Sequence, residues 1–314
     1  MYKGKKISLV IPARNEQKLI KPTLENVPKT IDKVYVIDDG STDKTASVVR
    51  EIIKGDKRIE LIQHPRNLGV GQAIITGYKR SSKDGYDIAV VIGGDNQMDL
   101  RDLPNFLEPL AKGEADYTKG NRFLLGGNAY TDMPNKRFFG NSMLSFITKM
   151  ASGYWKVFDT QDGYTSITKE AIDRVDWSQA WKGYGYVGDW LVLFNVYNLK
   201  VIDVPRRAIY LKGERQSQIK VFRYIITVLP RMINRFFYRM AMKYFFQDFH
   251  PLIFFYLLGM ILLPAGLIMG AWLVWVRLTV GAIAGTTAIL CALLIITGLQ
   301  LLLFGMLFDM EQNK

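Results

Sequence analysis

The stretch that decides the fold is KVYVIDDGSTDKTASVVREII, residues 33–53. Its first part, Val34–Ile37, is an unbroken apolar run that predicts a buried strand. The acidic turn Asp38–Asp43 follows, and a helix is predicted to open near Ser41 to Thr45. A fully apolar strand that leads directly into a helix is typical of a parallel sheet covered by helices on both faces.

The same order of strand and helix recurs on both sides of this stretch. KISLVIPARNE predicts a strand at Ile7–Ile11 that Pro12 closes, and DIAVVIGGD predicts a fourth strand. Between them, IELIQHPRNLGVGQAIITGYKRS predicts a short strand, a loop and a helix from about Gly71 to Ser81. We therefore predict an α/β fold with a mostly parallel sheet and helices on both of its faces.

Polar side chains follow each of the four predicted strands. The carboxyl ends of parallel strands meet at one edge of a sheet, where the ligands of such folds bind. We expect four groups to face one crevice there: Arg14 to Glu16, Asp38 with Asp39, Arg66 with Asn67, and Asp95 to Asp99. The last group, in IAVVIGGDNQMD (residues 88–99), offers two carboxylates and two amides. It is either a loop that returns to water or a site for a metal ion and its phosphates.

The C-terminal part of the chain contains two long apolar runs. Leu252–Val276 has 25 residues without a charge and Val280–Phe308 has 29, with only three residues between them. A helix needs about 20 such residues to cross the hydrocarbon of a bilayer. We predict two spans in a tight hairpin, because a soluble helix of this length normally carries a polar face. Glycines at 266, 270, 281 and 285 would let this hairpin pack closely against a second copy, so a homo-oligomer is a further possibility.

The net charge of +12 lies entirely on residues 1–250, since Pro251–Lys314 is neutral. From Arg215 to Gln247 there are seven bases without an acid, among many aromatic residues. Such a block fits helices that lie in an anionic headgroup layer, and its place beside an apolar hairpin argues against nucleic-acid binding. The two spans predict an integral membrane protein, and by the positive-inside rule the excess of bases predicts that its N-terminal domain is cytoplasmic.

Two smaller features agree with this location. The start MYKGKKISLVIPARNE has only a short apolar run without a small-residue cleavage site, so we expect no signal peptide. The single cysteine, Cys291, lies in the second apolar run and excludes a disulfide within the chain.

Four motifs together carry a resemblance to a known family. LVIPARNE, YVIDDGSTDKT, RNLGVGQAIITGY and VVIGGDNQ stand in an order and spacing similar to those of the inverting nucleotide-sugar glycosyltransferases of family 2, which have the GT-A (Rossmann-like) fold. With the hairpin, the chain most resembles the membrane-bound polyprenyl-phosphate glycosyltransferases, such as the dolichyl-phosphate mannose synthase group. The resemblance covers residues 5 to about 220. It implies a glycosyltransferase domain at 1–214, basic interfacial helices at 215–250 and a membrane hairpin at 251–314.

The resemblance implies a divalent-cation site in the loop after the fourth strand. The family's motif there usually reads Asp-x-Asp-x-Gln, and here Gly93 stands for the first Asp while Asp95 and Gln97 remain. Mg²⁺ and Mn²⁺ accept water and phosphate oxygens for most of their ligands, so one carboxylate and one amide remain workable. We expect Mg²⁺ or Mn²⁺ as the cofactor, bound more weakly than by two carboxylates. A purely structural turn is the alternative.

The donor pocket is also implied by the resemblance. Asp39 would meet the nucleobase or ribose, although two acids before Gly40 also suit an Asx turn and a helix cap. A basic residue in the family's mobile loop would cover the donor diphosphate and stabilise the leaving nucleotide. The implied nucleotide-sugar-binding residues are Pro12, Ala13, Asn15, Glu16, Asp38, Asp39, Arg66, Asn67, Asp95, Lys212 and Arg215.

The acceptor side is implied by residues further along the chain. Guanidinium groups match phosphate oxygens in a bidentate way, and Arg122, Arg137 and Asn141 stand where the polyprenyl-phosphate enzymes bind the lipid phosphate. Asp189 stands where many family 2 enzymes have a general base, but a phosphate acceptor is already an anionic nucleophile and needs none. The catalytic residues implied are Asp95, Arg122 and Asp189, and helix capping is the alternative for Asp189.

Together these features predict an inverting transferase. A sugar would pass from a UDP- or GDP-sugar to polyprenyl or dolichyl phosphate, giving a lipid-linked monosaccharide on the cytoplasmic face of the membrane. Two rivals stay open: a transferase that acts on diacylglycerol or a growing glycan, and a non-catalytic membrane-anchored protein that binds nucleotide sugars.

Overall fold

The structure is a computed structural model that describes residues 1–133, 135–209 and 221–313, without the side chains of 132, 136, 137 and 221–226. The chain divides into two compact units, Met1–Phe236 and Phe237–Lys314. The helix α9 (Val221–Ala241) begins in the first unit and ends in the second.

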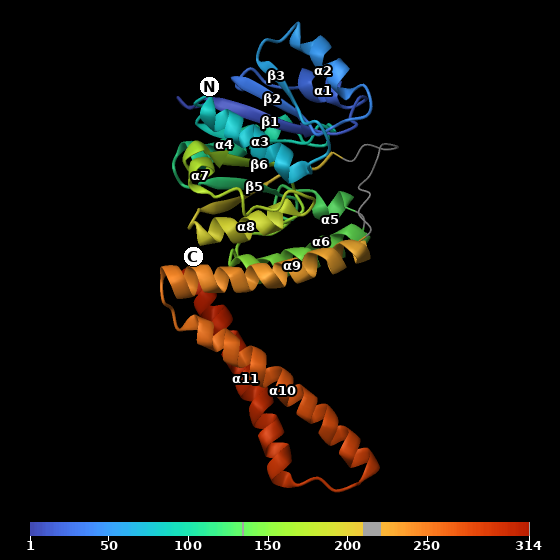
Figure 1. Cartoon of the computed structure of the whole chain (residues 1–314), viewed down its shortest axis with the longest axis vertical. Coiled ribbons are helices and arrows are strands. Elements are labelled where there is room, and N and C mark those ends of the chain that lie inside the picture. The colour runs from blue at the N-terminus through green and yellow to red at the C-terminus, as the bar shows by residue number, and fades with distance from the viewer. Residues whose placement is uncertain (134, 210–220, 314) are drawn as a thin grey trace. The chain divides into compact units, whose positions relative to one another are not determined.

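The first unit is built on a seven-stranded sheet (Figure 1). The strand order is β3-β2-β1-β4-β6-β5-β7, and β6 alone runs antiparallel to its neighbours β4 and β5. The predicted α/β class with a mostly parallel sheet is thus confirmed. The strands are β1 (Ile7–Ala13), β2 (Lys33–Asp38), β3 (Ile59–Gln63), β4 (Ile88–Val91), β5 (Tyr117–Asn121), β6 (Thr165–Thr168) and β7 (Val201–Pro205).

The prediction that Pro12 closes the first strand is wrong, because β1 continues to Ala13 and pairs Pro12 with Ile37 of β2. The carbonyl of Val10 accepts a hydrogen bond from Ile92 on the β4 side, and Pro12, two residues on, faces the same side. The ladder with β4 ends at Val10 and Val91. Pro12 has no N–H to donate, but the ladder has already ended there, so no carbonyl of β4 is left without a donor.

Helices cover both faces of the sheet, as predicted. Leu9 and Ile11 of β1 belong to a core that also contains Ile20 of α1 and Phe106 of α4. Val10 faces the opposite way and contacts α3, where a Cβ on Gly77 would lie 2.2 Å from its side chain. Besides the first part of α9, the described helices of this unit are α1 (Ile20–Glu25), α2 (Thr45–Ile53), α3 (Val70–Lys83), η1 (Leu100–Asp102), α4 (Leu103–Ala111), α5 (Ala129–Asp132), α6 (Asn135–Ser152), α7 (Lys169–Arg174) and α8 (Tyr186–Val196).

The first half of α9 packs against α6 and α8. Met232 of α9 shares a small core with Ala151 of α6 and Val192 of α8. Both α6 and α9 leave large apolar side chains exposed at helical spacing, namely Phe139, Met143, Phe146, Leu229 and Ile233. Two amphipathic helices in one unit are suited to lie on an apolar surface. The sequence analysis predicted such helices only after residue 215.

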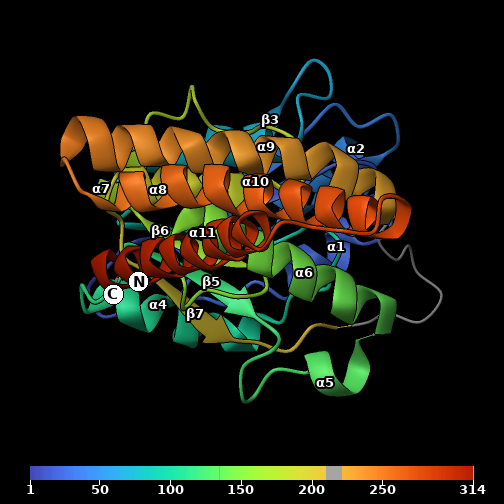
Figure 2. The same cartoon turned by 90° about the horizontal axis from the view of Figure 1, so that it is seen from below.

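The second unit contains two long antiparallel helices, α10 (Leu252–Thr279) and α11 (Gly285–Gln312), which both views show as a hairpin (Figure 2). A short π-helical segment, η2 (Met242–Gln247), precedes them. In the most apolar 18-residue windows of α10 and α11, only 22% and 17% of residues are buried. This exposure fits membrane spans better than core helices of a soluble protein.

The loop that joins the two hairpin helices lies later in the chain than the apolar runs predicted. The second apolar run begins at Val280, but Gly281 has φ +98° and the helix begins only at Gly285. Gly266 faces the other helix of the same chain, where a Cβ would lie 2.8 Å from Ile295 Cγ1, whereas a Cβ on Gly281 or Gly285 would have no atom within 4 Å. Close helix approach through Gly266 thus serves the hairpin itself.

Candidate active site

The two acids after β2 organise the loops at the carboxyl edge of the sheet. The Asp38 carboxylate accepts hydrogen bonds from the Ser41 amide at 3.0 Å and from Gln63 Nε2 at 3.0 Å. Asp38 therefore caps its own turn and ties β2 to β3. The Asx-turn alternative that the sequence left open describes Asp38 well.

Asp39 binds the loop that follows β3. Its Oδ1 accepts from the Leu68 amide at 2.9 Å and lies 2.8 Å from His64 Nδ1, and its Oδ2 accepts from the Gly69 amide at 2.9 Å. Gly40 has φ +66°, and a Cβ there would lie 2.6 Å from the Arg66 carbonyl carbon. A glycine is therefore required where this turn meets the loop.

The remaining donor-side residues lie on adjoining loops. Asn15 has φ +57° and its Oδ1 accepts from the Thr42 amide at 2.9 Å, while the Glu16 amide donates to Thr45 Oγ1 at 2.8 Å. Arg66 and Asn67 are exposed. The structure thus brings Pro12, Ala13, Asn15, Glu16, Asp38, Asp39, Arg66 and Asn67 to the loops around the ends of β1, β2 and β3. Their predicted contacts with a nucleotide sugar stay predictions.

Asp95 lies on the loop after β4, at the same edge. Its Oδ1 accepts from the Gln97 amide at 3.2 Å, and no described residue forms an ion pair with it. Burial raises the pKa of Asp95, and the nearby Asp162 charge adds to that rise, while the Gln97 amide and the positive charge of Arg206 oppose it. A half-buried carboxylate in this state favours a cation as a partner.

Gly93, in the same loop, lies next to the Asp95 carboxylate. A Cβ on Gly93 would lie 2.9 Å from Asp95 Oδ1, so a side chain at this position would stand directly beside the carboxylate. Among the described residues no group of three acids, histidines or cysteines converges on a metal position. A divalent cation in this loop would find one carboxylate, that of Asp95, and would take other ligands from phosphate and water, while Gln97 as a further ligand stays a prediction.

A charge network, which the sequence analysis did not predict as a unit, lies at this edge beyond β4. Arg122 follows β5, and its guanidinium binds Asp159 in a bidentate way, with Nε–Oδ2 and Nη2–Oδ1 distances of 2.7 Å. Asp162 precedes β6 and lies 2.6 Å from Nε of Arg206, which follows β7. Burial opposes the ionisation of Asp162, but the charges of Arg206 and Arg122 outweigh it and lower its pKa.

The topology brings these residues together. β4, β5 and β7 run in the same direction, and β6 runs the opposite way between β4 and β5. The ends of β4, β5 and β7 and the start of β6 therefore share one edge, which carries Asp95, Arg122, Arg206 and Asp162, respectively. Pairs such as Asp162 with Arg206 are 44 residues apart, so no local motif reveals them.

Asp189 lies in the first turn of α8 and is fully buried. Its Oδ1 accepts from Nε of Arg231 and of Arg235, both at 2.7 Å, and its Oδ2 accepts from the Trp181 amide and from Arg235 Nη2, both at 3.0 Å. The Arg231 guanidinium lies 4.1 Å from the Trp181 ring centroid. The carboxylate thus anchors α9 to α8, and a direct catalytic role for it stays a prediction.

The other predicted acceptor residues lie in α6 or outside the described residues. Asn141 is half-buried in α6, with its Nδ2 3.7 Å from Met133 Sδ. Arg137 belongs to the same helix, and its side chain is outside the described part of the structure, as are Lys212 and Arg215 entirely.

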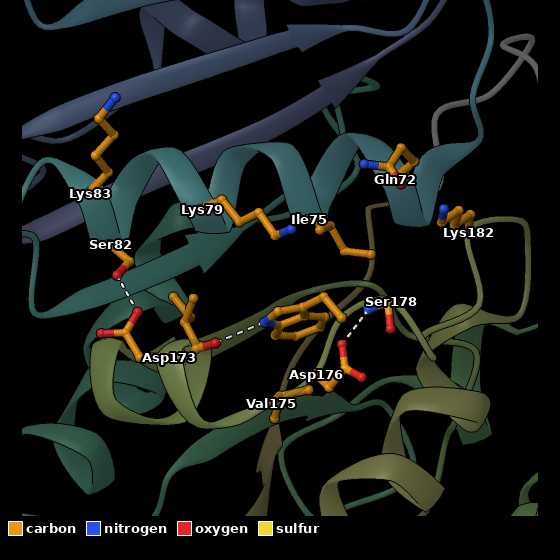
Figure 3. Close-up of a pocket in the computed structure, with 12 residues that line it drawn as sticks. Gln72, Ile75, Lys79, Ser82, Lys83, Asp173, Val175, Asp176, Ser178 and Lys182 are labelled. Atoms are coloured by element: carbon orange, nitrogen blue, oxygen red, sulfur yellow. Dashed lines mark hydrogen bonds between the residues drawn. The ribbon is translucent and has the colours of Figure 1, made fainter.

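A groove of about 670 Å³ lies away from these residues, between α3 and the segment from α7 to α8 (Figure 3). Lysines from α3 and acids from the facing segment line it, and the Trp177 indole donates to the Ile172 carbonyl at 2.8 Å. No predicted site residue lines this groove, so it is separate from the carboxyl edge described above.

The chain is similar to known glycosyltransferases over most of its first unit. The family described as glycosyl transferase family 2 matches residues 8–176. The UDP-N-acetylglucosamine–dolichyl-phosphate N-acetylglucosaminyltransferase of Methanococcus voltae is 32% identical over 219 residues, which cover 66% of this chain and 86% of that protein. The polyprenol monophosphomannose synthase of Mycolicibacterium smegmatis is 25% identical over 210 residues, covering 63% of this chain and 75% of that protein.

Among solved structures, one similar fold is that of glucosyl-3-phosphoglycerate synthase from Mycobacterium tuberculosis, in complex with Mn²⁺, UDP-glucose and phosphoglyceric acid. The TM-score is 0.55 at 19% sequence identity, and the match covers 76% of this chain and 81% of that one. At this identity the likeness concerns the fold, and it agrees with the GT-A fold expected from the sequence.

Proposed function

The chain belongs to glycosyl transferase family 2, and from this premise we propose that it transfers a sugar from a nucleotide sugar to a polyprenyl phosphate, with inversion at the anomeric carbon. The observation that carries the acceptor class is the likeness to the Methanococcus voltae enzyme, whose name gives dolichyl phosphate as the acceptor and of which this chain spans 86%. The name of that enzyme also gives UDP-N-acetylglucosamine as its donor, so we expect this donor before other nucleotide sugars.

The membrane hairpin supports a lipid acceptor. Two 28-residue apolar helices would hold the chain in the bilayer, where the tail of a long isoprenoid also stays. Only the phosphate of the acceptor then has to reach the catalytic edge of the sheet. The exposed apolar side chains of α6 and α9 would bring the first unit to the headgroup layer.

The nucleophile needs no general base in this reaction. A phosphate monoester is anionic at neutral pH and attacks through one of its own oxygens. This agrees with Asp189, whose two carboxylate oxygens are already bonded to Arg231, Arg235 and the Trp181 amide. Arg122 is the described arginine that we propose to receive the acceptor phosphate, in exchange for part of its contact with Asp159.

The leaving group is a nucleoside diphosphate, which departs with its negative charge concentrated near Asp95 and Gln97. A divalent cation, Mg²⁺ or Mn²⁺, supplies charge neutralisation to that diphosphate when bound. The oxygens of Asp95 and Gln97 would hold the ion, and the half-buried position of Asp95 strengthens the attraction. Asp39 and the loop residues that it binds would form the nucleoside side of the pocket.

The proposed orientation follows from the second unit and from the charge. Arg239, in the last turn of α9, forms a buried ion pair with Asp309 near the end of α11, with Nη1 2.7 Å from Oδ1. The chain therefore enters and leaves the hairpin on one side, which carries the excess of bases. By the positive-inside rule we propose that this side, with the catalytic unit, is cytoplasmic.

A transfer assay tests the proposal. Purified full-length protein in detergent would receive short-chain polyprenyl phosphate, Mn²⁺ and a panel of radiolabelled UDP- and GDP-sugars. We expect one donor, UDP-N-acetylglucosamine first, to give a labelled lipid that mild acid hydrolyses. The Asp95→Asn variant is assayed beside the wild type, and we expect it to be inactive.

Two results would overturn the proposal. Saturable nucleotide-sugar binding without labelled lipid from any donor would reject the lipid-phosphate acceptor and favour a glycan or diacylglycerol. Equal turnover by the wild type and Asp95→Asn would reject the catalytic role of the metal loop.

A further inference from the structure

The carboxylate of Asp162 is shared by two arginines. Arg206 Nε lies 2.6 Å from Oδ2, and Arg122 Nε lies 3.5 Å from the same oxygen. Asp162 and Arg206 are 2% and 4% exposed, so neither charge is screened by water to a large extent. The shorter contact makes Arg206 the main partner of Asp162, and Arg122 the secondary one.

Arg122 has a second and closer acid. It binds Asp159 in a bidentate way at 2.7 Å, so two carboxylates and two guanidinium groups form a buried set of zero net charge. An anion that binds Arg122 must draw the guanidinium away from acids. The cost of that movement depends on what remains beside each carboxylate, since a buried charge without a partner is strongly unfavourable.

Arg206 also reaches the loop that carries Asp95. Its Nη1 lies 3.5 Å from the Gln97 carbonyl, which also accepts from the Ile209 amide at 3.2 Å. Met98 forms a β-bridge with Ala208 beside this contact. The segment 206–209 therefore joins the donor loop to the acid that Arg122 shares.

We propose that Arg206 is a positioning residue for the acceptor: it stays on Asp162 when Arg122 turns to the acceptor phosphate, and so lowers the free-energy cost of that turn. Without Arg206, Arg122 would be the remaining guanidinium partner of the buried Asp162, beside the Tyr164 amide at 2.9 Å, and Asp162 would hold it away from the phosphate. Because Arg206 also touches the Gln97 carbonyl, the arrangement links the acceptor site to the donor loop. This inference rests on the proposed transfer to a lipid phosphate.

The test compares three variants of the full-length protein in detergent. Arg206→Gln removes the charge, Arg206→Lys keeps it, and Arg207→Gln is the control, because Arg207 is the exposed neighbour outside this network. For each variant, KM for polyprenyl phosphate and for the nucleotide sugar, kcat, and nucleotide-sugar affinity by calorimetry with and without Mn²⁺ would be measured.

We expect Arg206→Gln to raise KM for polyprenyl phosphate about tenfold, within the usual range of coupling between two sites. Nucleotide-sugar affinity should change much less, Arg206→Lys should recover part of the loss, and Arg207→Gln should match the wild type. Adding Asp162→Asn to Arg206→Gln should lower the acceptor KM again, because the competing acid is gone.

The outcomes separate this inference from the proposed function. If the wild type forms no labelled lipid with polyprenyl phosphate, the proposed function fails. If the wild type is active but Arg206→Gln leaves the acceptor KM unchanged, or shifts both KM values together with the melting temperature, the positioning role of Arg206 is rejected.

Discussion

Asp189 and Arg235 form a buried bidentate ion pair in which the arginine Nε and Nη2 lie 2.7 and 3.0 Å from the two carboxylate oxygens. Arg235 is 9% exposed at its side chain and Asp189 is not exposed at all. With Arg231 on the same oxygen as Arg235 Nε, the acid fixes the first half of α9 to the start of α8. We therefore expect Asp189 to contribute mainly to the stability of the fold, and not directly to sugar transfer.

Asp189→Ala should therefore destabilise the protein. It leaves Arg235 buried without an acid, and losing one partner of a buried ion pair costs about 3–5 kcal/mol. Arg231→Gln, at a side chain that is 32% exposed, should cost much less. Thermal unfolding in detergent measures both. An unchanged melting temperature for Asp189→Ala, together with lost turnover, would instead favour direct catalysis by this carboxylate.

Asp95, in contrast to Asp189, should lower the stability of the metal-free protein while it is needed for function. Its pKa is raised in the folded protein, chiefly by burial, so the folded state favours the protonated form. Stability therefore declines as pH rises from the ordinary pKa of an aspartate through the raised one. Metal-free Asp95→Asn should be at least as stable as the wild type at neutral pH, because it removes this unfavourable ionisation.

Metal addition should reverse that order. Mn²⁺ with nucleotide sugar should raise the melting temperature of the wild type, with a gain of about 2.7 kcal/mol at 100 times Kd. Asp95→Asn should gain little. The wild-type response should weaken as pH falls through the raised pKa, because protons then compete with the metal. Equal metal responses in both proteins would exclude Asp95 as a ligand.

Gly93→Asp should strengthen metal binding. A side chain at this position stands beside Asp95 Oδ1, and a second carboxylate increases the charge that attracts a divalent cation. We expect the Mn²⁺ concentration for half-maximal activity to fall about three- to tenfold, as ligand charge sets affinity at such sites. Gly93→Ala adds the Cβ without the charge and is the matched control. A similar change in both variants would refute the charge argument.

Gly298→Ala should loosen the hairpin. A Cβ there would lie 2.4 Å from the Leu263 amide nitrogen, so the two helices must separate, at a cost of about 1–3 kcal/mol for overpacking. Gly285→Ala, with no atom within 4 Å of the new Cβ, is the control. Cys291 is buried between the helices, with its Sγ 3.4 Å from the Gly266 carbonyl, and serves as the reporter.

The measurement is the rate at which a maleimide labels Cys291 in detergent. We expect faster labelling in Gly298→Ala and the wild-type rate in Gly285→Ala. Identical rates in all three proteins would show that Gly298 does not control helix approach.

The sequence predicted the parts of this protein that local patterns encode. The unbroken apolar strands, the glycine at the turn after Asp39 and the two apolar runs depend on neighbouring residues, and the structure has the corresponding strands, turn and hairpin helices. The grouping of the polar loops also followed, because the direction of parallel strands decides which ends meet.

Other features depend on contacts between distant residues. Nothing in the sequence around Arg206 indicates that it binds Asp162, because the pair forms only when β6 inserts antiparallel between β4 and β5. The end of β1 differs from its prediction for a related reason: Pro12 is tolerated because β4 stops at Val91. The exposed face of α6 is not predictable from its sequence, since its apolar residues suit a core equally well.

The measurement that tests the central claim most directly is a comparison of three acceptors in one assay. Polyprenyl phosphate, the corresponding polyprenol without its phosphate, and diacylglycerol would each be offered with the productive nucleotide sugar and Mn²⁺. We predict labelled lipid from polyprenyl phosphate alone, because only the phosphate supplies the anionic nucleophile and the partner for Arg122. Equal transfer to the polyprenol, or transfer to diacylglycerol alone, would contradict the account.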